Sequence, residues 1–105
     1  MKKHSYTRVD VARRVSFKLN ISNDEARILI DCFYEVMYEM IVEPKDSIHI
    51  EIRNFGVFDV VPTKKRKNAM NPKTKERVVI PARKKVIFKP SKKIKNELYK
   101  PREFN

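Results

Sequence analysis

The fold of this chain is decided by one stretch, Asn54-Phe55-Gly56-Val57-Phe58-Asp59-Val60. Gly56 is the only glycine in 105 residues. Such a glycine indicates a backbone position that needs a positive φ or a close approach by another segment. Just upstream, Ile48, Ile50 and Ile52 alternate with polar residues, the period-two pattern of a strand with one buried face. The stretch therefore predicts a tight turn that leads from this strand into a second one.

Two amphipathic helices are predicted before this turn. Thr7 followed by Asp10 is typical of a helix start, and apolar residues then recur at spacings of three and four. Ser22 with Glu25 forms a capping box for a second helix, whose apolar stripe continues for about five turns. Pro44 ends this helix because it has no backbone donor and restricts the residue before it.

A charged hairpin and a short helix are predicted after the turn. Residues 62–83 form two polar limbs that reverse at Asn71-Pro72-Lys73-Thr74-Lys75. Because such a ribbon has almost nothing to bury, we expect it to project from the body of the protein as an arm. Phe88 then belongs to a last strand that returns to the core, and Ser91 caps a helix that Pro101 ends.

Positive charge is concentrated in the C-terminal part of the chain. Residues 62–102 hold sixteen of the 25 lysines and arginines and only two acids, so this part carries +14 and the remainder −2. A polymer of phosphates is the partner that such a field attracts, because each neutralised phosphate releases condensed counterions. The charge pattern therefore favours nucleic acid binding over a merely solvated basic face.

Other classes of protein find little support in the sequence. One cysteine and two histidines give neither an internal disulfide nor a zinc ligand set. No apolar run approaches the roughly 18 residues of a membrane span, and the start lacks the apolar stretch of a secretory signal. Paired carboxylates, a nucleophile with its base and a glycine-rich phosphate loop are also missing. We expect a soluble, intracellular protein that has no enzyme activity and that binds no cofactor, metal ion, membrane or small-molecule substrate.

The order of these segments resembles the bacterial histone-like HU and integration host factor (IHF) family of DNA-bending proteins. The resemblance covers almost the whole chain. It is carried by the two helices and by four segments in near-family spacing, which are Asn54 to Val60, Asn71-Pro72-Lys73-Thr74, Ile80-Pro81-Ala82-Arg83, and Val86-Ile87-Phe88-Lys89-Pro90-Ser91-Lys92-Lys93.

The resemblance implies an α+β fold in an intertwined dimer, either of identical chains or with a paralogue. Each chain would be a single domain, 1–105, with a helical dimerisation part, a three-stranded antiparallel sheet carrying the arm, a C-terminal helix and a tail. These parts would span 1–44, 45–90 with the arm at about 62–83, 91–100 and 101–105. The intersubunit core would contain Phe33, Phe55, Phe58 and Phe88.

The implied function is architectural binding and bending of double-stranded DNA with little dependence on sequence. The arms would lie in the minor groove, and Pro72 would wedge between base pairs. The protein would organise the nucleoid in a bacterial cytoplasm, or act in a host cytoplasm if a virus encodes it. The implied DNA contacts are Lys64, Lys65, Arg66, Lys67, Met70, Asn71, Pro72, Lys73, Lys75, Arg77, Arg83, Lys85, Lys89, Ser91, Lys92 and Lys93.

Four features depart from the family pattern, and one of them is Pro44, which replaces a glycine turn between the second helix and the first strand. Met70 stands where arginine is common, so it could enlarge the apolar wedge beside Pro72. Lys75 replaces a usual glycine of the arm tip. The spacing from Phe58 to Asn71 is one residue longer than the pattern, which predicts a bulge or register shift in the first arm strand.

Two other functions are compatible with the basic composition. One is a small RNA-binding or ribosome-associated protein. The other is an arm-bearing scaffold whose lysines serve only solubility. A DNA-bending protein should bind a deformable duplex more tightly than A-form RNA, which an RNA-binding protein should not. Its affinity for DNA should fall as salt is raised, whereas a scaffold should have no DNA affinity to lose.

Overall fold

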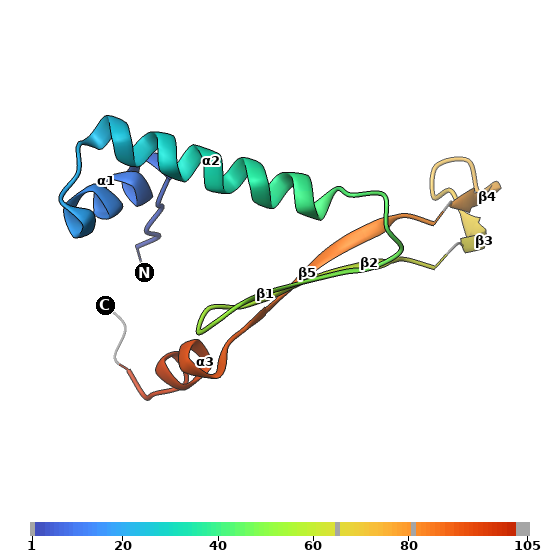
Figure 1. Ribbon diagram of the computed structural model, residues 1–105. Helices are drawn as coiled ribbons and strands as arrows, with labels where there is room; N and C mark the ends of the chain where they lie inside the picture. Colours follow the sequence, from blue (N-terminus) through green and yellow to red (C-terminus); the bar gives the residue numbers. More distant parts are fainter. Residues whose placement is uncertain (1, 65, 81, 103–105) are drawn as a thin grey trace. The chain divides into compact units, whose positions relative to one another are not determined.

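The computed structural model describes residues 2–64, 66–80 and 82–102, with only the backbone described at 66–69 and 77–80. The chain divides into two compact units, residues 2–43 with Arg102, and Pro44–Pro101 (Figure 1). The first unit contains the helices α1 (Arg8–Leu19) and α2 (Asn23–Ile41). The second contains β1 (Ile48–Ile52), β2 (Gly56–Pro62), β3 (Arg66–Met70), β4 (Arg77–Ile80), β5 (Lys84–Pro90) and α3 (Lys92–Leu98).

Both long helices begin at the capping residues that the sequence predicts. The Asp10 carboxylate accepts hydrogen bonds from the Thr7 backbone nitrogen at 2.8 Å and from the Thr7 hydroxyl at 3.1 Å. In α2, Ser22 Oγ accepts from the Glu25 backbone nitrogen at 3.1 Å and donates to Glu25 Oε1 at 3.1 Å. These contacts satisfy donors that a helix start otherwise leaves without intrahelical partners. The helix starts are therefore confirmed, and α2 ends at Ile41, ahead of Pro44.

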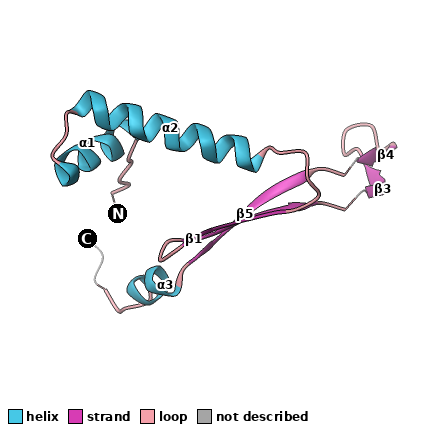
Figure 2. Ribbon diagram, viewed as in Figure 1, coloured by secondary structure: helices cyan, strands magenta, loops and turns pink. Residues whose placement is uncertain are grey.

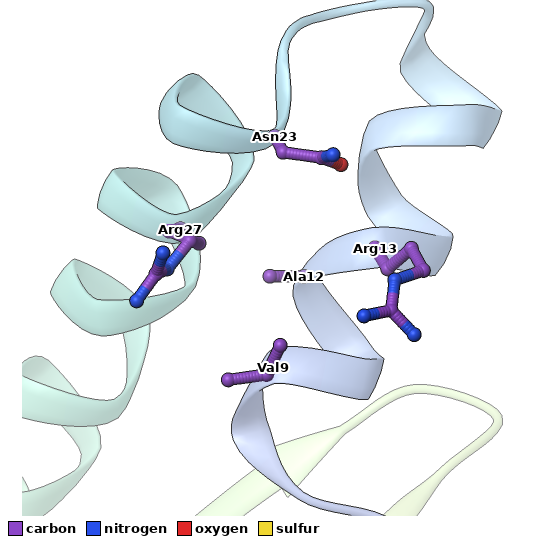
Figure 3. Close-up of a pocket in the computed structure, with 5 residues that line it drawn as sticks. All are labelled: Val9, Ala12, Arg13, Asn23 and Arg27. Carbon is purple, nitrogen blue, oxygen red and sulfur yellow. The ribbon is translucent and has the colours of Figure 1, made fainter.

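Two alanines form the buried contact between α1 and α2. Ala12 is 2% exposed and Ala26 is 0% exposed, and such small side chains let two helix backbones approach closely. Arg8 Nε and Asp31 Oδ1, 3.1 Å apart, add a surface ion pair across the same helices. Beside this contact runs a groove of about 160 Å³ (Figure 3), lined by Val9, Ala12, Arg13, Asn23 and Arg27.

The second unit is built on a three-stranded antiparallel sheet, as the resemblance implies, and its strands lie in the order β1-β2-β5. Ile50 of β1 lies opposite Phe58 of β2, which lies opposite Phe88 of β5. The ring centroids of Phe58 and Phe88 are 4.8 Å apart, and that of Phe55 is 5.4 Å from Phe88. This apolar face has Val60 as its largest fully buried side chain.

Gly56 occupies a position where a side chain has no room. A Cβ atom there would lie 2.5 Å from the carbonyl oxygen of Lys89 and 2.8 Å from Cε1 of Phe88. Asn54, two residues earlier, has a φ of 63°, so the turn before β2 places a non-glycine residue in the left-handed region. The close approach predicted from the single glycine is therefore confirmed.

Gly56→Ala should lower the free energy of unfolding by about 1–3 kcal/mol, because β5 must move away to admit the methyl group. Urea denaturation at one fixed protein concentration measures the change. Lys85→Ala, at an exposed position of the same sheet, is the matched control and should stay within about 0.5 kcal/mol of the parent protein. Equal effects of the two substitutions would contradict the close-approach explanation.

The arm is a separate two-stranded ribbon of β3 and β4, which Figure 2 shows beyond the ends of β2 and β5. Its register pairs Arg66 with Ile80 and Ala69 with Val78, so three steps along β3 match two along β4. The irregularity between Arg66 and Ala69 confirms the register shift predicted from the extra residue.

Candidate nucleic-acid interface

The polar face of the sheet carries an ion cluster centred on Asp59. Oδ1 of Asp59 lies 2.6 Å from Nδ1 of His49 on β1, and Oδ2 lies 3.2 Å from Nζ of Lys89 on β5. The Asp59 side chain is only 18% exposed, while His49 and Lys89 are both well exposed. The carboxylate therefore holds Lys89, a predicted DNA contact, against the sheet.

The same contacts shift the titration of Asp59. The hydrogen bond from His49, and then that from Lys89, lower the pKa of the Asp59 carboxyl below its usual 3.8. A carboxyl whose pKa is lower in the folded than in the unfolded chain stabilises the fold above the unfolded pKa. That contribution is lost as the pH falls through the folded pKa.

Asp59→Asn should flatten the decline in unfolding free energy that the parent protein shows as the pH drops below about 4. The amide cannot ionise, so this position no longer contributes pH-dependent stability. Urea denaturation between neutral pH and strong acid measures the decline. Glu51→Gln removes a carboxylate of β1 that has no ion-pair partner among the described residues, and it should leave the decline unchanged. An Asp59→Asn profile parallel to that of the parent would contradict the coupling.

Ser91 fixes the N-terminus of α3 to the turn between β1 and β2. Its Oγ accepts from the Ile94 backbone nitrogen at 3.3 Å and donates to the Asn54 carbonyl at 3.0 Å. Its backbone nitrogen donates to the Phe55 carbonyl at 2.9 Å. The predicted cap is confirmed. The first turn of α3 then presents Lys92 and Lys93, both exposed.

A shallow hollow of about 250 Å³ lies where the sheet meets α3. Arg53, Lys89 and Ser91 are among its lining residues together with Glu51, so two cations and one carboxylate lie near the capped helix start. Arg53 is absent from the DNA contacts predicted from the sequence. It follows Ile52 on the polar side of the Ile48–Ile52 alternation, and this position could have marked it as an exposed cation of the sheet.

The base of the arm is closed by Thr63 and Arg83. The Thr63 backbone nitrogen donates to the Arg83 carbonyl at 2.6 Å, and the Arg83 backbone nitrogen donates to Thr63 Oγ1 at 2.9 Å. Nearby, Lys84 Nζ donates to the carbonyl of Lys45. The two bonds between Thr63 and Arg83 join the limbs of the arm where they leave the sheet, and the Arg83 side chain is exposed.

The arm tip is a compact turn that is closed at Asn71. The Asn71 backbone nitrogen donates to the Glu76 carbonyl at 2.8 Å, and Asn71 Oδ1 accepts from the Lys73 backbone nitrogen at 3.0 Å. Lys75 has a φ of 57°, so it adopts the left-handed conformation that glycine adopts most easily. That conformation costs a residue with a side chain about 1 kcal/mol. Pro72 is exposed at this turn.

The structure describes the remaining predicted DNA contacts to different extents. Lys65 lies outside the described residues, as does Pro81 of the resembling segment. Only the backbone is described for Arg66, Lys67 and Arg77. The side chains of a further set are exposed, namely Lys64, Met70, Lys73, Lys75 and Lys85, whereas Asn71 is half-buried.

Within the described parts of the chain, no group of three or more His, Cys, Asp or Glu side chains could hold a metal ion. No helix there is both long enough and apolar enough to cross a membrane.

The chain belongs to the family described as "Bacterial DNA-binding protein", whose model matches residues 6–99. The predicted membership of the HU and IHF family is thereby confirmed.

Curated relatives agree with this assignment, and a solved structure shares the fold. The chain is 32% identical over 92 residues to integration host factor subunit alpha of Alcanivorax borkumensis, covering 88% of each chain. It is 33% identical over 91 residues to the same subunit of Saccharophagus degradans, covering 87% of this chain and 86% of that one. Anabaena HU, in a cocrystal structure with DNA, matches with a TM-score of 0.75 at 22% identity, over 91% of this chain and 100% of that one. The last similarity shows the shared fold.

Proposed function

We propose that this protein binds and bends double-stranded DNA as a dimer, with little dependence on base sequence, and has no catalytic activity. One observation carries the proposal: the +14 charge of residues 62–102 lies on the elements that form the arm, β5 and α3 of an HU-like fold. The partner is a phosphate polymer, and the protein acts in the cytoplasm as an organiser of the nucleoid.

Exposed apolar surface supports the dimer. Among the described residues, four hydrophobic side chains are buried, whereas Phe33, Phe55 and Phe88 and many other large ones are exposed. On so small a chain, exposed aromatic side chains leave apolar surface that burial against a second chain would stabilise. A second copy, or a paralogue, supplies the missing half of the core, with Phe33, Phe55, Phe58 and Phe88 in the shared interface.

The arm and the sheet face provide two kinds of DNA contact in this proposal. The arm lies in the minor groove and places Pro72, with Met70 beside it, against a base step. Flanking DNA meets the polar face of the sheet and the start of α3, where Ser91 adds the backbone donors of a helix N-terminus. The proposed phosphate and groove contacts are Lys64, Lys65, Arg66, Lys67, Asn71, Lys73, Lys75, Arg77, Arg83, Lys85, Lys89, Lys92 and Lys93.

Bending follows from an exchange of free energies. For the class of minor-groove proteins that includes IHF and HU, unstacking a base step costs a few kcal/mol, and the bent duplex then contacts more protein. The exposed cations of the sheet and α3 provide that additional contact. Preference among sites then comes from how easily each duplex deforms, since few hydrogen bonds reach base edges.

Pro72→Ala should reduce the bend angle more than the affinity, because it removes the wedge and keeps the cations. Fluorescence transfer between dyes at the ends of a short duplex measures the angle, and titration of the same duplex measures the affinity. Lys73→Ala, one residue further along the same turn, is the control and should weaken binding without a comparable loss of bend. An unaltered angle in Pro72→Ala would rule out the wedge.

Replacing Lys64, Lys65 and Lys67 with Ala should reduce the slope of log affinity against log salt by about 0.9 per lost phosphate contact. A matched triple replacement of Arg13, Lys18 and Arg27 removes the same charge from the helical unit and should leave the slope unchanged. Equal slopes in the two variants would show that net charge alone, and no arm contact, drives binding.

The RNA-binding alternative is tested in the same titrations. A nicked or flexible duplex should bind more tightly than a straight duplex, and both more tightly than A-form RNA, whose deep major groove and shallow minor groove suit the arms poorly. The reverse order would favour RNA as the partner. A protein that binds neither at low salt would be a scaffold.

A further inference from the structure

We infer that the outer faces of α1 and α2 form a second interface between copies of this chain, separate from the shared dimer core. The outer face of α1 is a basic surface around Phe17, and the outer face of α2 is an acidic surface around Ile28. In the interface, Phe17 of one dimer packs against Ile28 of the next. The contact needs no DNA.

The α1 outer face is apolar at its centre and positive at its edges. Phe17 is 88% exposed and lies about 140° around the helix from Ala12, the residue that packs on α2. A shallow hollow of about 400 Å³ is lined by Phe17 together with Arg13, Arg14 and Lys18. With four basic residues and one acidic residue, α1 carries a net charge of +3.

The α2 outer face has the opposite charge around a similar centre. Ile28 is 70% exposed and lies about 200° around the helix from Ala26, the residue that packs on α1. Asp24 and Asp31 lie one turn to either side of it, and Glu35 lies a turn further on the same face. With five acidic residues and one basic residue, α2 carries a net charge of −4 in a chain whose overall charge is +12.

Charge and shape select a second copy as the partner of these two faces. A phosphate backbone could pair with Arg13, Arg14 and Lys18, but it offers nothing apolar to cover Phe17. The α2 outer face offers both carboxylates and an aliphatic side chain, and it is present at the same concentration as its partner face. Aromatic and arginine side chains together are also what protein interfaces favour.

The contact joins two different faces, so it does not close on itself and can add further dimers. Because the two faces are different, each copy that uses one of them keeps the other available, and head-to-tail contacts of this kind extend into rows of dimers. Two ion pairs already engage charges of these helices, Arg13 with Asp10 at 3.7 Å and Arg8 with Asp31 at 3.1 Å. Both pairs are exposed and therefore weak, so exchanging them for ion pairs with another dimer costs little free energy. One helix face against another buries a small area, which places the contact among weak interfaces.

Sedimentation equilibrium of nuclease-treated protein tests the inference, at an ionic strength of about 0.15 M, where long-range repulsion between cationic dimers is screened. The parent protein should show an average mass that rises beyond the dimer with concentration, up to about 1 mM. Phe17→Glu and Ile28→Lys should each lower the association constant about tenfold or more, as expected for central interface residues. Tyr99→Glu, an exposed aromatic on the other unit, is the matched control and should change nothing.

Mixing the two variants tests whether the α1 face of one dimer binds the α2 face of another. The Phe17→Glu protein keeps an intact α2 face and the Ile28→Lys protein keeps an intact α1 face, so the mixture should regain association that neither variant shows alone. A mixture that stays dimeric would overturn the inference, and so would a parent protein that remains dimeric throughout, or association that nuclease removes. Unchanged DNA bending by both variants at low protein concentration shows that the result is independent of the proposed function.

Discussion

The close approach of backbone at Gly56 is the constraint on which the second unit depends. It allows β5 to pack against the start of β2, with the Phe88 ring where a Cβ would otherwise stand. The same turn supplies the Asn54 and Phe55 carbonyls that accept hydrogen bonds from Ser91. The start of α3 is therefore fixed to the sheet, and the cations of β5 and of α3 are held on one framework. The position of Gly56 thus bears on where the cations of β5 and of the start of α3 are presented.

The molecule separates its charges from its apolar surface. The sheet has an aromatic face that is incompletely covered in one chain and a polar face on which Asp59 holds Lys89 and His49. The helical unit has its own division, with a basic α1 and an acidic α2. In the proposed function the aromatic face is covered by a second chain and the polar face and arm meet phosphate. In the proposed contact between dimers, the outer faces of α1 and α2 join one dimer to another.

Much of this architecture could be predicted from the sequence because local rules decide it. The helix starts at Thr7 and Ser22 follow from capping chemistry, and the turn at Gly56 follows from the single glycine. The register shift in β3 follows from counting residues against the family spacing. The cluster around Asp59 could not be predicted, because it depends on which residues of three strands lie opposite one another. The same holds for the contacts between Thr63 and Arg83, twenty residues apart. That Phe17 and Ile28 both remain exposed follows only from how α1 packs on α2.

The most direct test of the account uses the unmodified protein and a duplex of about 30 base pairs, long enough to be bent over one site. Fluorescence transfer between dyes at its two ends is followed as protein is added at low salt, with the mass of the complex determined in parallel. If the protein bends DNA as a dimer, transfer rises and saturates at two chains per duplex, and the mass of the complex equals that of one duplex with two chains. A complex that forms without any rise in transfer, or that saturates with a single chain, would contradict it.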